Sequence, residues 1–421
     1  MKQFDNIRAH KPEGIENRKA YIVGGGVAGI AGAVNASRLG MNTLLIEKTI
    51  NLGGLATIGL VNFFVPMCNG RGTQIIKGMA EEMLQLSKKY GFSRMSQDWE
   101  NGEPGEGKTM QRYVCRYSAP IYMLALTEFL KENHVDLLLD TTLCDAVCED
   151  GIVKGIITDG KSGLEYYTAK MFIDASGDAD LLVKAGVPTV QGKNYHTYYG
   201  FVTNSELCRK AADTKDMADL YKMQFGGSST LYGEGHPEGH RYWLGTTNRD
   251  VTEYITENQL ELLSKIKNDD RSERDLTLLP SMPQLRTTRR IDGDYTLAET
   301  DIYKHFDDSI GAICDFDRRD FLYEIPLRCL TKRGFGNIIT AGRSAAGEGY
   351  AWDVLRVIPP AIITGQAAGA ACAIAIKSGI SVPAVDINEL QTLLESQNVL
   401  VHFDDKLVKK GGGEKADTGH F

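Results

Sequence analysis

The spacing of apolar and polar residues predicts a strand, a helix and a second strand near the start of the chain. The apolar run AYIV at 20–23 is followed by three glycines, and residues 27–40 then place small and apolar side chains at helical spacing. The segment NTLLIEK at 42–48 has the composition of another strand. We therefore expect an α/β domain built on a mainly parallel sheet.

Three further segments extend this domain. Residues 79–90 and 119–133 have amphipathic spacing and predict helices. Residues 136–159 contain two extended runs joined by a glycine-containing turn, which predicts a β meander beside the parallel sheet. The segment MFIDASGD at 171–178 begins as another buried strand.

The amino-acid composition changes at about residue 190. From there to about residue 300 the chain is rich in aromatic, charged and turn-forming residues, whereas residues 337–377 return to a strand, a glycine-rich turn and a long helix. We therefore expect a discontinuous domain with an insertion that shapes the substrate site. The predicted organisation is an N-terminal extension at 1–19, a Rossmann-like domain at 20–190 and 330–405, an inserted, mainly β domain at 191–329, and a flexible tail at 406–421.

The composition of the chain indicates which partners it can bind and in which cellular compartment it works. The 421 residues carry 47 Lys and Arg against 55 Asp and Glu, a net charge of −8, which argues against binding to nucleic acid. The longest apolar stretch, 361–376, contains Thr364, Gly365 and Gln366 and is shorter than the roughly 20 residues that span a bilayer, so we expect a buried helix and no membrane span. The eight cysteines form no CxxC pair, and the polar opening lacks the apolar core of a signal peptide. We expect a cytoplasmic protein.

The three glycines after the first strand form a dinucleotide-binding fingerprint. Gly24-x-Gly26-x-x-Gly29 directly follows a predicted strand and opens a predicted helix. Gly24 permits the tight turn, Gly26 lets the backbone approach a pyrophosphate, and Gly29 allows the helix to pack closely on the strand. Glu47 ends the next strand, where its carboxylate can accept hydrogen bonds from ribose hydroxyls and disfavours a 2′-phosphate. Dinucleotide binding is therefore predicted.

A second glycine pair, Gly53 and Gly54, would let the chain fold back over the pyrophosphate. With this pair included, three separated motifs, at 24–54, 172–188 and 336–371, resemble the glutathione-reductase superfamily of flavoproteins in its fumarate-reductase-like branch. The sequence most closely resembles the broad group of FAD-dependent oxidoreductases. The opening residues, over about the first 30 positions, also resemble those of oleate hydratases.

The resemblance implies FAD as the cofactor. It implies noncovalent binding, because covalent members attach the flavin through a histidine shortly after the glycine pair, and LGGLATIGLVNFF contains none. It also implies that the helix after Arg356 directs its N-terminus at the isoalloxazine ring, where a helix dipole stabilises negative charge. Fingerprint and resemblance together assign the following cofactor-binding residues: Gly24, Gly26, Gly29, Glu47, Lys48, Gly53, Gly54, Val147, Ala175, Ser176, Gly177, Asp178, Gly342, Arg343, Arg356, Val357 and Ile358.

Candidate catalytic groups lie in three places. Arg289 could grip a substrate carboxylate or pair with a nearby acid, two interpretations of equal weight, whereas pairing is favoured for Arg286 and Arg290. The nearby acids are Asp292, Asp294 and Glu299. His196 could shuttle a proton, although a structural histidine is the favoured interpretation. Glu348 could act as a base or cap the last helix.

A metal site is not expected from the sequence. His236 and His240 lie in HPEGH, where Pro237 and Gly239 prevent the helix that would align two imidazoles in an HExxH motif. The eight scattered cysteines do not have the spacing of a zinc ribbon.

These observations favour an FAD-dependent oxidoreductase that transfers a hydride between a small organic substrate and noncovalently bound FAD at flavin N5. The alternative is a non-redox, FAD-containing hydratase or isomerase, because the opening residues resemble those of oleate hydratases and the chain has no second GxGxxG motif for NAD(P)H. A non-catalytic flavin-binding protein is a third interpretation. The sequence does not identify the electron donor or acceptor, and it leaves a homo-oligomer open.

Overall fold

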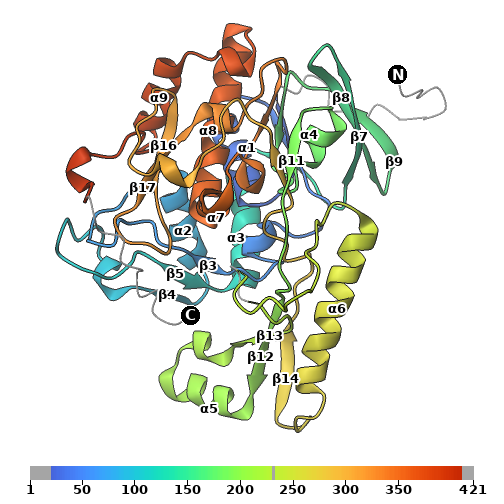
Figure 1. The fold of residues 1–421 in the computed structure, drawn as a ribbon, viewed down its shortest axis with the longest axis vertical. Helices are drawn as coiled ribbons and strands as arrows, with labels where there is room; N and C mark the ends of the chain where they lie inside the picture. Colours follow the sequence, from blue (N-terminus) through green and yellow to red (C-terminus); the bar gives the residue numbers. More distant parts are fainter. Residues whose placement is uncertain (1–19, 230–232, 410–421) are drawn as a thin grey trace.

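Figure 1 shows the fold of the protein. It is built around a five-stranded parallel sheet. The computed structural model describes residues 20–229 and 233–409, so the predicted extension at 1–19 and most of the predicted tail lie outside the described residues. The residues of the four strands β18, β10, β1 and β2 are all buried, as expected for a parallel sheet covered on both faces. In sheet order the strands are β18 (Ile338–Thr340), β10 (Met171–Asp174), β1 (Ala20–Val23), β2 (Thr43–Ile46) and β6 (Asp136–Leu138).

Strand β18 joins this sheet by pairing in parallel with β10, with Asp174 opposite Thr340. The chain therefore returns to its first sheet after a long excursion, which is the topology that a discontinuous Rossmann-like domain requires. The predicted α/β class is confirmed, while the exact domain boundaries stay predictions.

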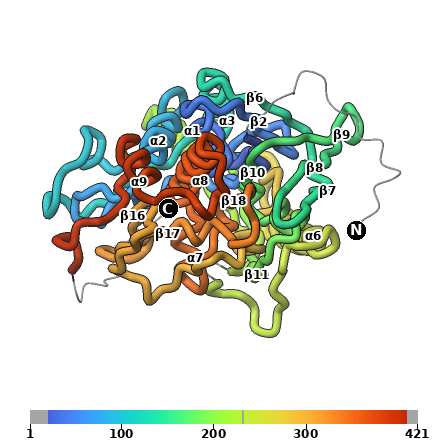
Figure 2. Tube along the Cα trace, turned by 90° about the horizontal axis from the view of Figure 1, so that it is seen from above, coloured from blue at the N-terminus to red at the C-terminus, as the bar shows by residue number. Residues whose placement is uncertain are grey.

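Helices α1 (Val27–Arg38) and α8 (Ile358–Ser378) cross at close range beside the sheet (Figure 2). A Cβ added at Gly365 would lie 2.1 Å from the backbone oxygen of Ala28, and one at Gly369 would lie 2.5 Å from that of Gly32. Only glycine allows this approach. Within the described residues α8 is long and apolar enough to cross a membrane by length and composition, but its apolar window is entirely buried inside the protein. It is a core helix, longer at both ends than the predicted apolar stretch.

A Gly365→Ala variant is expected to lose about 2 kcal/mol of unfolding free energy. A Gly→Ala change inside a helix normally stabilises by about 0.5–1 kcal/mol, but here the added methyl group meets the backbone of Ala28, and overpacking costs about 1–3 kcal/mol. Urea unfolding followed by circular dichroism measures the difference. Ser378→Ala, at the exposed end of the same helix, is the control and should change stability by less than about 0.5 kcal/mol. A Gly365→Ala protein as stable as the wild type would contradict the close crossing.

The remaining elements of the first domain agree with the predicted pattern. The expected turn of the meander lies at Asp150 and Gly151, whose φ angles of 48° and 75° are those of a two-residue hairpin. A separate three-stranded sheet has the order β3-β5-β4. The elements are β3 (Phe63–Phe64), α2 (Met79–Lys88), β4 (Ser93–Met95), β5 (Cys115–Tyr117), α3 (Ala119–Glu132), β7 (Thr142–Glu149), β8 (Ile152–Gly160), β9 (Gly163–Tyr167) and α4 (Asp180–Lys184).

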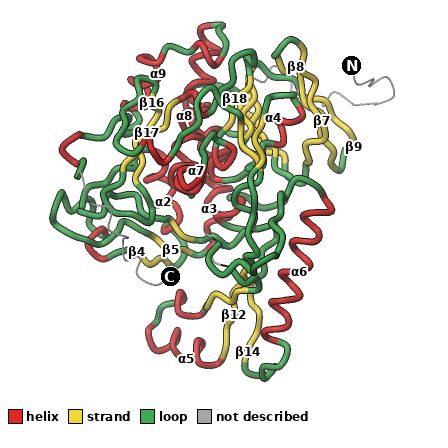
Figure 3. The backbone as a smooth tube through the Cα atoms, viewed as in Figure 1, coloured by secondary structure: helices red, strands yellow, loops and turns green. Residues whose placement is uncertain are grey.

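The inserted segment contains antiparallel sheets, as predicted, and also two helices that the sequence analysis did not place. Figure 3 shows these helices beside a three-stranded sheet that extends away from the first domain. The buried residues of the long helix α6, Tyr254, Asn258, Leu262 and Ile266, recur every four positions and form one face. The elements are β11 (Thr189–Gln191), β12 (Tyr199–Asn204), α5 (Ser205–Thr214), β13 (Lys222–Phe225), α6 (Asn248–Ile266), β14 (Arg274–Leu278) and β15 (Arg289–Ile291).

Strands β16 (Ser309–Cys314) and β17 (Leu322–Pro326) form a hairpin that packs against the C-terminal helices. The backbone N–H of Ala312 donates to the carbonyl of Leu400 at 2.6 Å, and the Ser309 hydroxyl donates to that of Val401 at 2.6 Å. This hairpin therefore lies with α7 (Gly349–Arg356), α8 and α9 (Ile387–Ser396), although the predicted boundaries place it in the insertion.

Candidate FAD site

The sequence motifs meet at the carboxyl edge of the parallel sheet. Val23 pairs with Ile46 and with Asp174, and Asp174 pairs with Thr340, so the residues that follow these strands come together at one edge. A cavity opens there. It is lined by Gly24, Gly26, Val27, Ala28, Glu47, Lys48, Thr49, Gly53, Gly54, Leu55, Ala56, Ile58, Ala175, Ser176, Gly177, Met282, Ala341, Gly342, Arg343, Arg356, Ile358 and Ala361.

Each of the three fingerprint glycines is required for a different physical reason. Gly24 has a φ of 108°, and a Cβ there would lie 2.3 Å from the backbone oxygen of Ala175. A Cβ at Gly29 would lie 1.9 Å from the oxygen of Gly24, so Gly29 sets the helix-to-strand contact and does not line the cavity. A Cβ at Gly26 would meet no protein atom within 4 Å. The space in front of Gly26, at the N-terminus of α1, fits a pyrophosphate.

The second glycine pair closes over the fingerprint as predicted. The N–H of Gly53 donates to the carbonyl of Gly25 at 2.8 Å, and Gly53 forms a parallel bridge with Gly26. A Cβ at Gly54 would lie 3.2 Å from the Cα of Gly26. The two glycine turns therefore form opposite sides of one narrow backbone-lined cradle.

Glu47 fixes the adjoining end of the cavity. Its carboxylate accepts hydrogen bonds from the N–H of Gly25 at 2.7 Å and from the N–H of Thr49 at 2.8 Å. Lys48 lies beside it in the lining. Glu47 is buried but lines the cavity, and its remaining lone pairs suit the predicted ribose contact.

The second and third motifs are joined by an ion pair. Arg343 Nη2 lies 3.1 Å from the Asp178 carboxylate, and its Nη1 donates to the carbonyl of Leu285 at 2.6 Å. Asp178 itself lies outside the cavity lining and acts by positioning Arg343, which does line it. Leu285 belongs to the inserted segment, so Arg343 also ties that segment to the cavity.

The first turn of α8 supplies few backbone donors. Proline occupies positions 359 and 360 and has no N–H, while the N–H of Ala361 donates to the carbonyl of Val357 at 3.0 Å. The first-turn donor that remains is the N–H of Ile358, and Ile358 lines the cavity. Val357 does not, and it serves as the N-cap of the helix.

Val147, predicted to contact adenine, lies on β7 outside the lining, so its role stays a prediction.

The sequence analysis missed several lining residues. Val27 and Ala28 are direct neighbours of the fingerprint glycines and could have been included, because the first helical turn faces the anion. Met282 had no local signal in the sequence, because a contact between distant residues brings it to the cavity. The N–H of Ser281, the residue before it, donates to the carbonyl of Ile58 at 2.9 Å.

The sequence profile of the family described as "FAD dependent oxidoreductase" matches residues 20–236 and 241–394. The chain belongs to this family. FAD is therefore the cofactor of the cavity, whose glycine cradle and helix N-termini fit a dinucleotide. The fumarate-reductase-like branch stays a prediction from the motifs, and so does the likeness of the opening residues to oleate hydratases.

Several solved structures match the chain at low sequence identity. One is p-nitrophenol 4-monooxygenase PnpA from Pseudomonas putida DLL-E4, with 14% identity, coverage of 93% of this chain and 90% of that chain, and a TM-score of 0.45. Another is L-proline dehydrogenase from P. horikoshii, with 12% identity, coverage of 91% and 99%, and a TM-score of 0.40. THI4 from Thermovibrio ammonificans is 16% identical over 41% of this chain and 64% of its own length, with a TM-score of 0.30. No curated protein matches the chain significantly in sequence.

None of the three predicted catalytic residues of this FAD-dependent oxidoreductase lines the described cavity, so their roles stay predictions. Arg289 Nη2 lies 2.6 Å from Asp180, and its Nε donates to the carbonyl of Asp178 at 2.9 Å. His196 Nε2 lies 2.6 Å from Glu261. Glu348 is exposed and begins α7 without a hydrogen bond from its side chain to the helix.

The structure reverses the predicted order among the three arginines, because the acids expected to pair with them have other partners. Asp292 pairs with Lys332 at 3.1 Å, and Glu299 pairs with Arg318 at 2.6 Å. Arg290 donates to the carbonyl of Ile291 at 3.0 Å instead of pairing with an acid. The favoured salt-bridge interpretation of Arg290 is therefore wrong.

Arg286 is the most unusual of the three arginines. Its side chain is buried with 6% exposure, and its Nε and Nη2 have no hydrogen-bond partner among the described residues. Burial lowers the pKa of its guanidinium, and the positive charges of Arg356 and Arg343 lower it further. Both of those neighbours line the cavity. The predicted salt bridge of Arg286 is wrong: its guanidinium has no acidic partner among the described residues, and its neighbours are the Tyr199 hydroxyl and the cavity-lining Arg343 and Arg356.

Asp174, which ends β10 within the second motif, should make stability depend on pH. Burial raises the pKa of Asp174 to about 6. Because this folded-state pKa exceeds the ordinary value of about 3.9, the proton stabilises the folded state, and that stability is lost as the pH rises through about 6. Between about pH 4.5 and pH 7.5 the wild type is expected to lose about 2 kcal/mol relative to Asp174→Asn, which cannot ionise.

Urea unfolding of both FAD-free proteins across this pH range measures the effect. The two proteins share every other titrating group, so the difference between them isolates Asp174. The variant also replaces an acceptor of the Leu182 N–H, which lowers its stability at every pH but not the slope. A difference that is flat with pH would contradict the raised pKa.

Proposed function

We propose that this family member transfers a hydride between a small, negatively charged organic substrate and noncovalently bound FAD. When bound, FAD supplies flavin N5 as the redox centre. The observation that carries the substrate charge is the buried guanidinium of Arg286, which has no acidic partner among the described residues and lies beside the cavity-lining Arg343 and Arg356. A buried cation without a partner is costly, and an anionic group bound nearby would offset that cost.

Noncovalent binding is supported by the composition of the cavity wall. The residues that line it in the described part of the chain include neither histidine, cysteine nor tyrosine, the side chains able to form a covalent flavin link. Binding would rest on backbone N–H groups at the start of α1, on Glu47 and on the Arg343 guanidinium.

The inserted segment is well placed to shape specificity. The side chain of Gln284 spans both parts of the protein, because it donates to the carbonyl of Gly59 at 2.8 Å and accepts from the N–H of Tyr199 at 2.9 Å. These two hydrogen bonds fix the position of the loop segment that contains Met282 and Arg286. The apolar side chains of Met282 and Ile58 would exclude water from the cavity, which strengthens charge interactions inside it.

The test is an anaerobic spectral titration of the purified, FAD-reconstituted protein. NADH, NADPH, hydroxy acids and enoates are compared with neutral alcohols and sugars, and loss of the flavin band near about 450 nm is recorded. Bleaching by a carboxylate and not by its neutral ester is the expected result. Conversion of a substrate without bleaching would favour the non-redox hydratase or isomerase alternative. Bleaching by neutral compounds alone would overturn the proposed substrate charge.

A further inference from the structure

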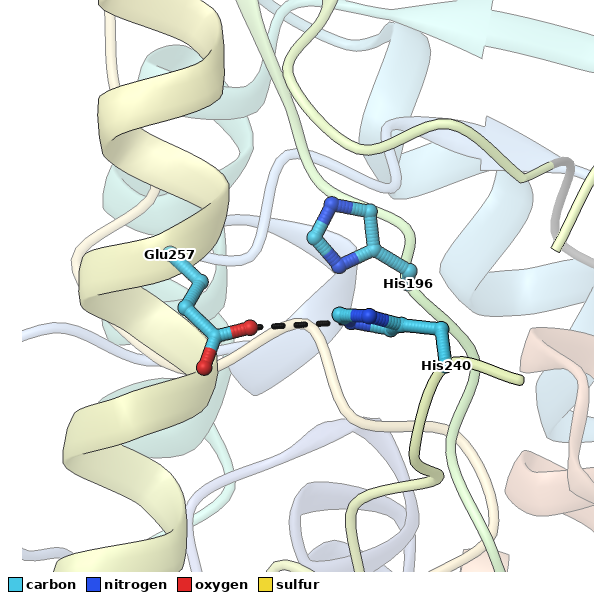
Figure 4. Close-up of side chains that lie close together, drawn as sticks. All are labelled: His196, His240 and Glu257. Carbon is cyan, nitrogen blue, oxygen red and sulfur yellow. Dashed lines mark ion pairs between the residues drawn. The ribbon is translucent and has the colours of Figure 1, made fainter. Parts of the chain in front are cut away.

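A second cluster of chemically active side chains lies in the inserted segment, apart from the FAD cavity. His196, His240 and Glu257 each offer one ligating atom, and these atoms all lie within 4.8 Å of one another. Figure 4 shows the two imidazoles and the carboxylate directed at a common point from three different segments. None of the three residues lines the described FAD cavity.

His196 is prepared to act as a ligand through Nδ1. Its side chain is buried, with 4% of the residue exposed, and Nδ1 has no hydrogen-bond partner among the described residues. Its other nitrogen, Nε2, lies 2.6 Å from the Glu261 carboxylate, which requires a proton on Nε2 in the neutral ring. The Nδ1 lone pair is therefore free. A carboxylate that holds the second nitrogen of a histidine in this way is the usual outer partner of a metal ligand.

His240 presents a second nitrogen of the same kind. Its Nε2 is buried without a hydrogen-bond partner, and the Glu257 carboxylate lies 3.6 Å away, beyond hydrogen-bonding distance. The His196 and His240 rings lie edge to face with centroids 4.8 Å apart. Two buried imidazole nitrogens that face each other without partners are costly, because native proteins satisfy nearly all such groups. A cation between them would satisfy both.

Helix α6 and its contacts hold the three side chains in place, together with the HPEGH motif. Glu257 and Glu261 are four residues apart on α6, so they face the same side of the helix. Lys265 at 2.9 Å and Ser228 at 3.0 Å fix the Glu261 carboxylate in turn. The two histidines therefore reach one point through tertiary structure, without the helix that the sequence ruled out.

We propose that His196, His240 and Glu257 bind a divalent first-row transition-metal ion, with water completing a four-coordinate site. Two imidazoles and one carboxylate are the donor set that Zn²⁺ and its neighbours prefer. Tetrahedral ligand atoms around Zn²⁺ lie about 3.3 Å apart, since the Zn–N distance is about 2.0–2.1 Å. Binding would therefore draw the loop at 233–245 toward α6.

The three ligands come from different parts of the inserted segment. His196 stacks on Trp243 with ring centroids 5.3 Å apart, and Trp243 packs with Tyr254 and Leu285 in one buried cluster. The ion would therefore clamp the loop, α6 and the segment after β11 onto a common core. The inference does not depend on the proposed redox reaction.

A second His–Glu–His group provides an internal control. His305 Nδ1 and His402 Nδ1 lie 2.6 Å and 3.0 Å from the two oxygens of Glu324, and His305 Nε2 lies 3.0 Å from Asp405. These hydrogen bonds already occupy the nitrogens and carboxylate oxygens that would ligate an ion. We therefore assign the metal site to His196, His240 and Glu257 alone.

The experiment is a Zn²⁺ titration of the full-length, FAD-loaded protein by calorimetry, with bound metal counted after dialysis. The wild type is expected to bind one equivalent with a raised melting temperature, and His240→Ala and Glu257→Gln are expected to lose it. Glu261→Gln should weaken binding by about 10–100-fold, the effect of removing an outer partner. His402→Ala should bind as the wild type does.

Flavin absorbance and circular dichroism confirm that each variant is folded, and His240 and Glu257 are exposed enough at 31% and 43% of their side chains to be replaced without opening the core. The proposal is overturned if the wild type binds no Zn²⁺ at about 10 µM free metal. It is also overturned if His240→Ala and Glu257→Gln bind the same equivalent with the same affinity, because binding then occurs elsewhere.

Discussion

A Gly26→Ala variant is expected to fold as stably as the wild type and to bind FAD at least about 100-fold more weakly, a loss of about 2.7 kcal/mol. Gly26 has a φ of −70° and a ψ of 173°, which alanine adopts without strain. A Cβ there would meet no protein atom within 4 Å. Among the described glycines, every other one with such open space has a positive φ. The protein itself therefore gives no reason for glycine at position 26, and the reason must be the ligand.

Gly24→Ala is the matched comparison in the same turn. Its φ of 108° and a Cβ distance of 2.3 Å to the Ala175 oxygen predict that alanine disrupts the fold itself. The two variants should therefore separate cofactor binding from stability. FAD titration followed by flavin fluorescence gives the affinity, and urea unfolding of the FAD-free proteins gives the stability. A Gly26→Ala protein that binds FAD within about threefold of the wild type would show that the pyrophosphate does not lie against this residue.

The strands and glycine turns of the FAD site could be predicted because their signals are local. Each strand of the parallel sheet is a short apolar run, and the residue after it is read directly from the sequence. Parallel pairing then brings these strand ends to one edge without further information, as the register of Val23, Ile46, Asp174 and Thr340 confirms. The glycine cradle could therefore be predicted without knowledge of contacts between distant residues.

The polar groups beyond the cradle could not be predicted, because their partners are distant in sequence. Arg286, Arg289 and Arg290 have nearly the same local context, yet Arg289 reaches Asp180, 109 positions away, and Arg286 reaches no acid. His196 likewise meets Glu261, 65 positions away on α6. The period of four on α6 was present in the sequence, but the surrounding aromatic and turn-forming residues favoured strands.

An Arg286→Met variant is expected to be more stable without FAD than the wild type and to lower the midpoint potential of bound FAD. We expect that replacing a buried charge without an acidic partner by an apolar side chain of similar length stabilises the protein by about 1–3 kcal/mol. The same charge favours the more negative, reduced form of a flavin in the cavity. A loss of about 1.4–2.8 kcal/mol of that preference corresponds to about 30–60 mV for a two-electron couple.

Arg289→Met is the matched control, because it removes an arginine three positions away that is already neutralised. Loss of the Asp180 pair at 2.6 Å should leave the potential within about 10 mV of the wild type and lower the stability slightly, by less than about 1 kcal/mol. Urea unfolding of the FAD-free proteins and anaerobic dye equilibration of the FAD-loaded proteins supply the two measurements.

The opposite signs of the two effects make the prediction decisive. A structural arginine would lower stability when removed and leave the potential unchanged, since its charge would be balanced within the protein. An arginine that serves the bound cofactor or substrate does the reverse, because the folded protein bears the cost of burying the charge and recovers it only when an anion binds. If Arg286→Met is less stable than the wild type and its potential is unchanged, the guanidinium has a structural partner and the proposed anionic substrate loses its support.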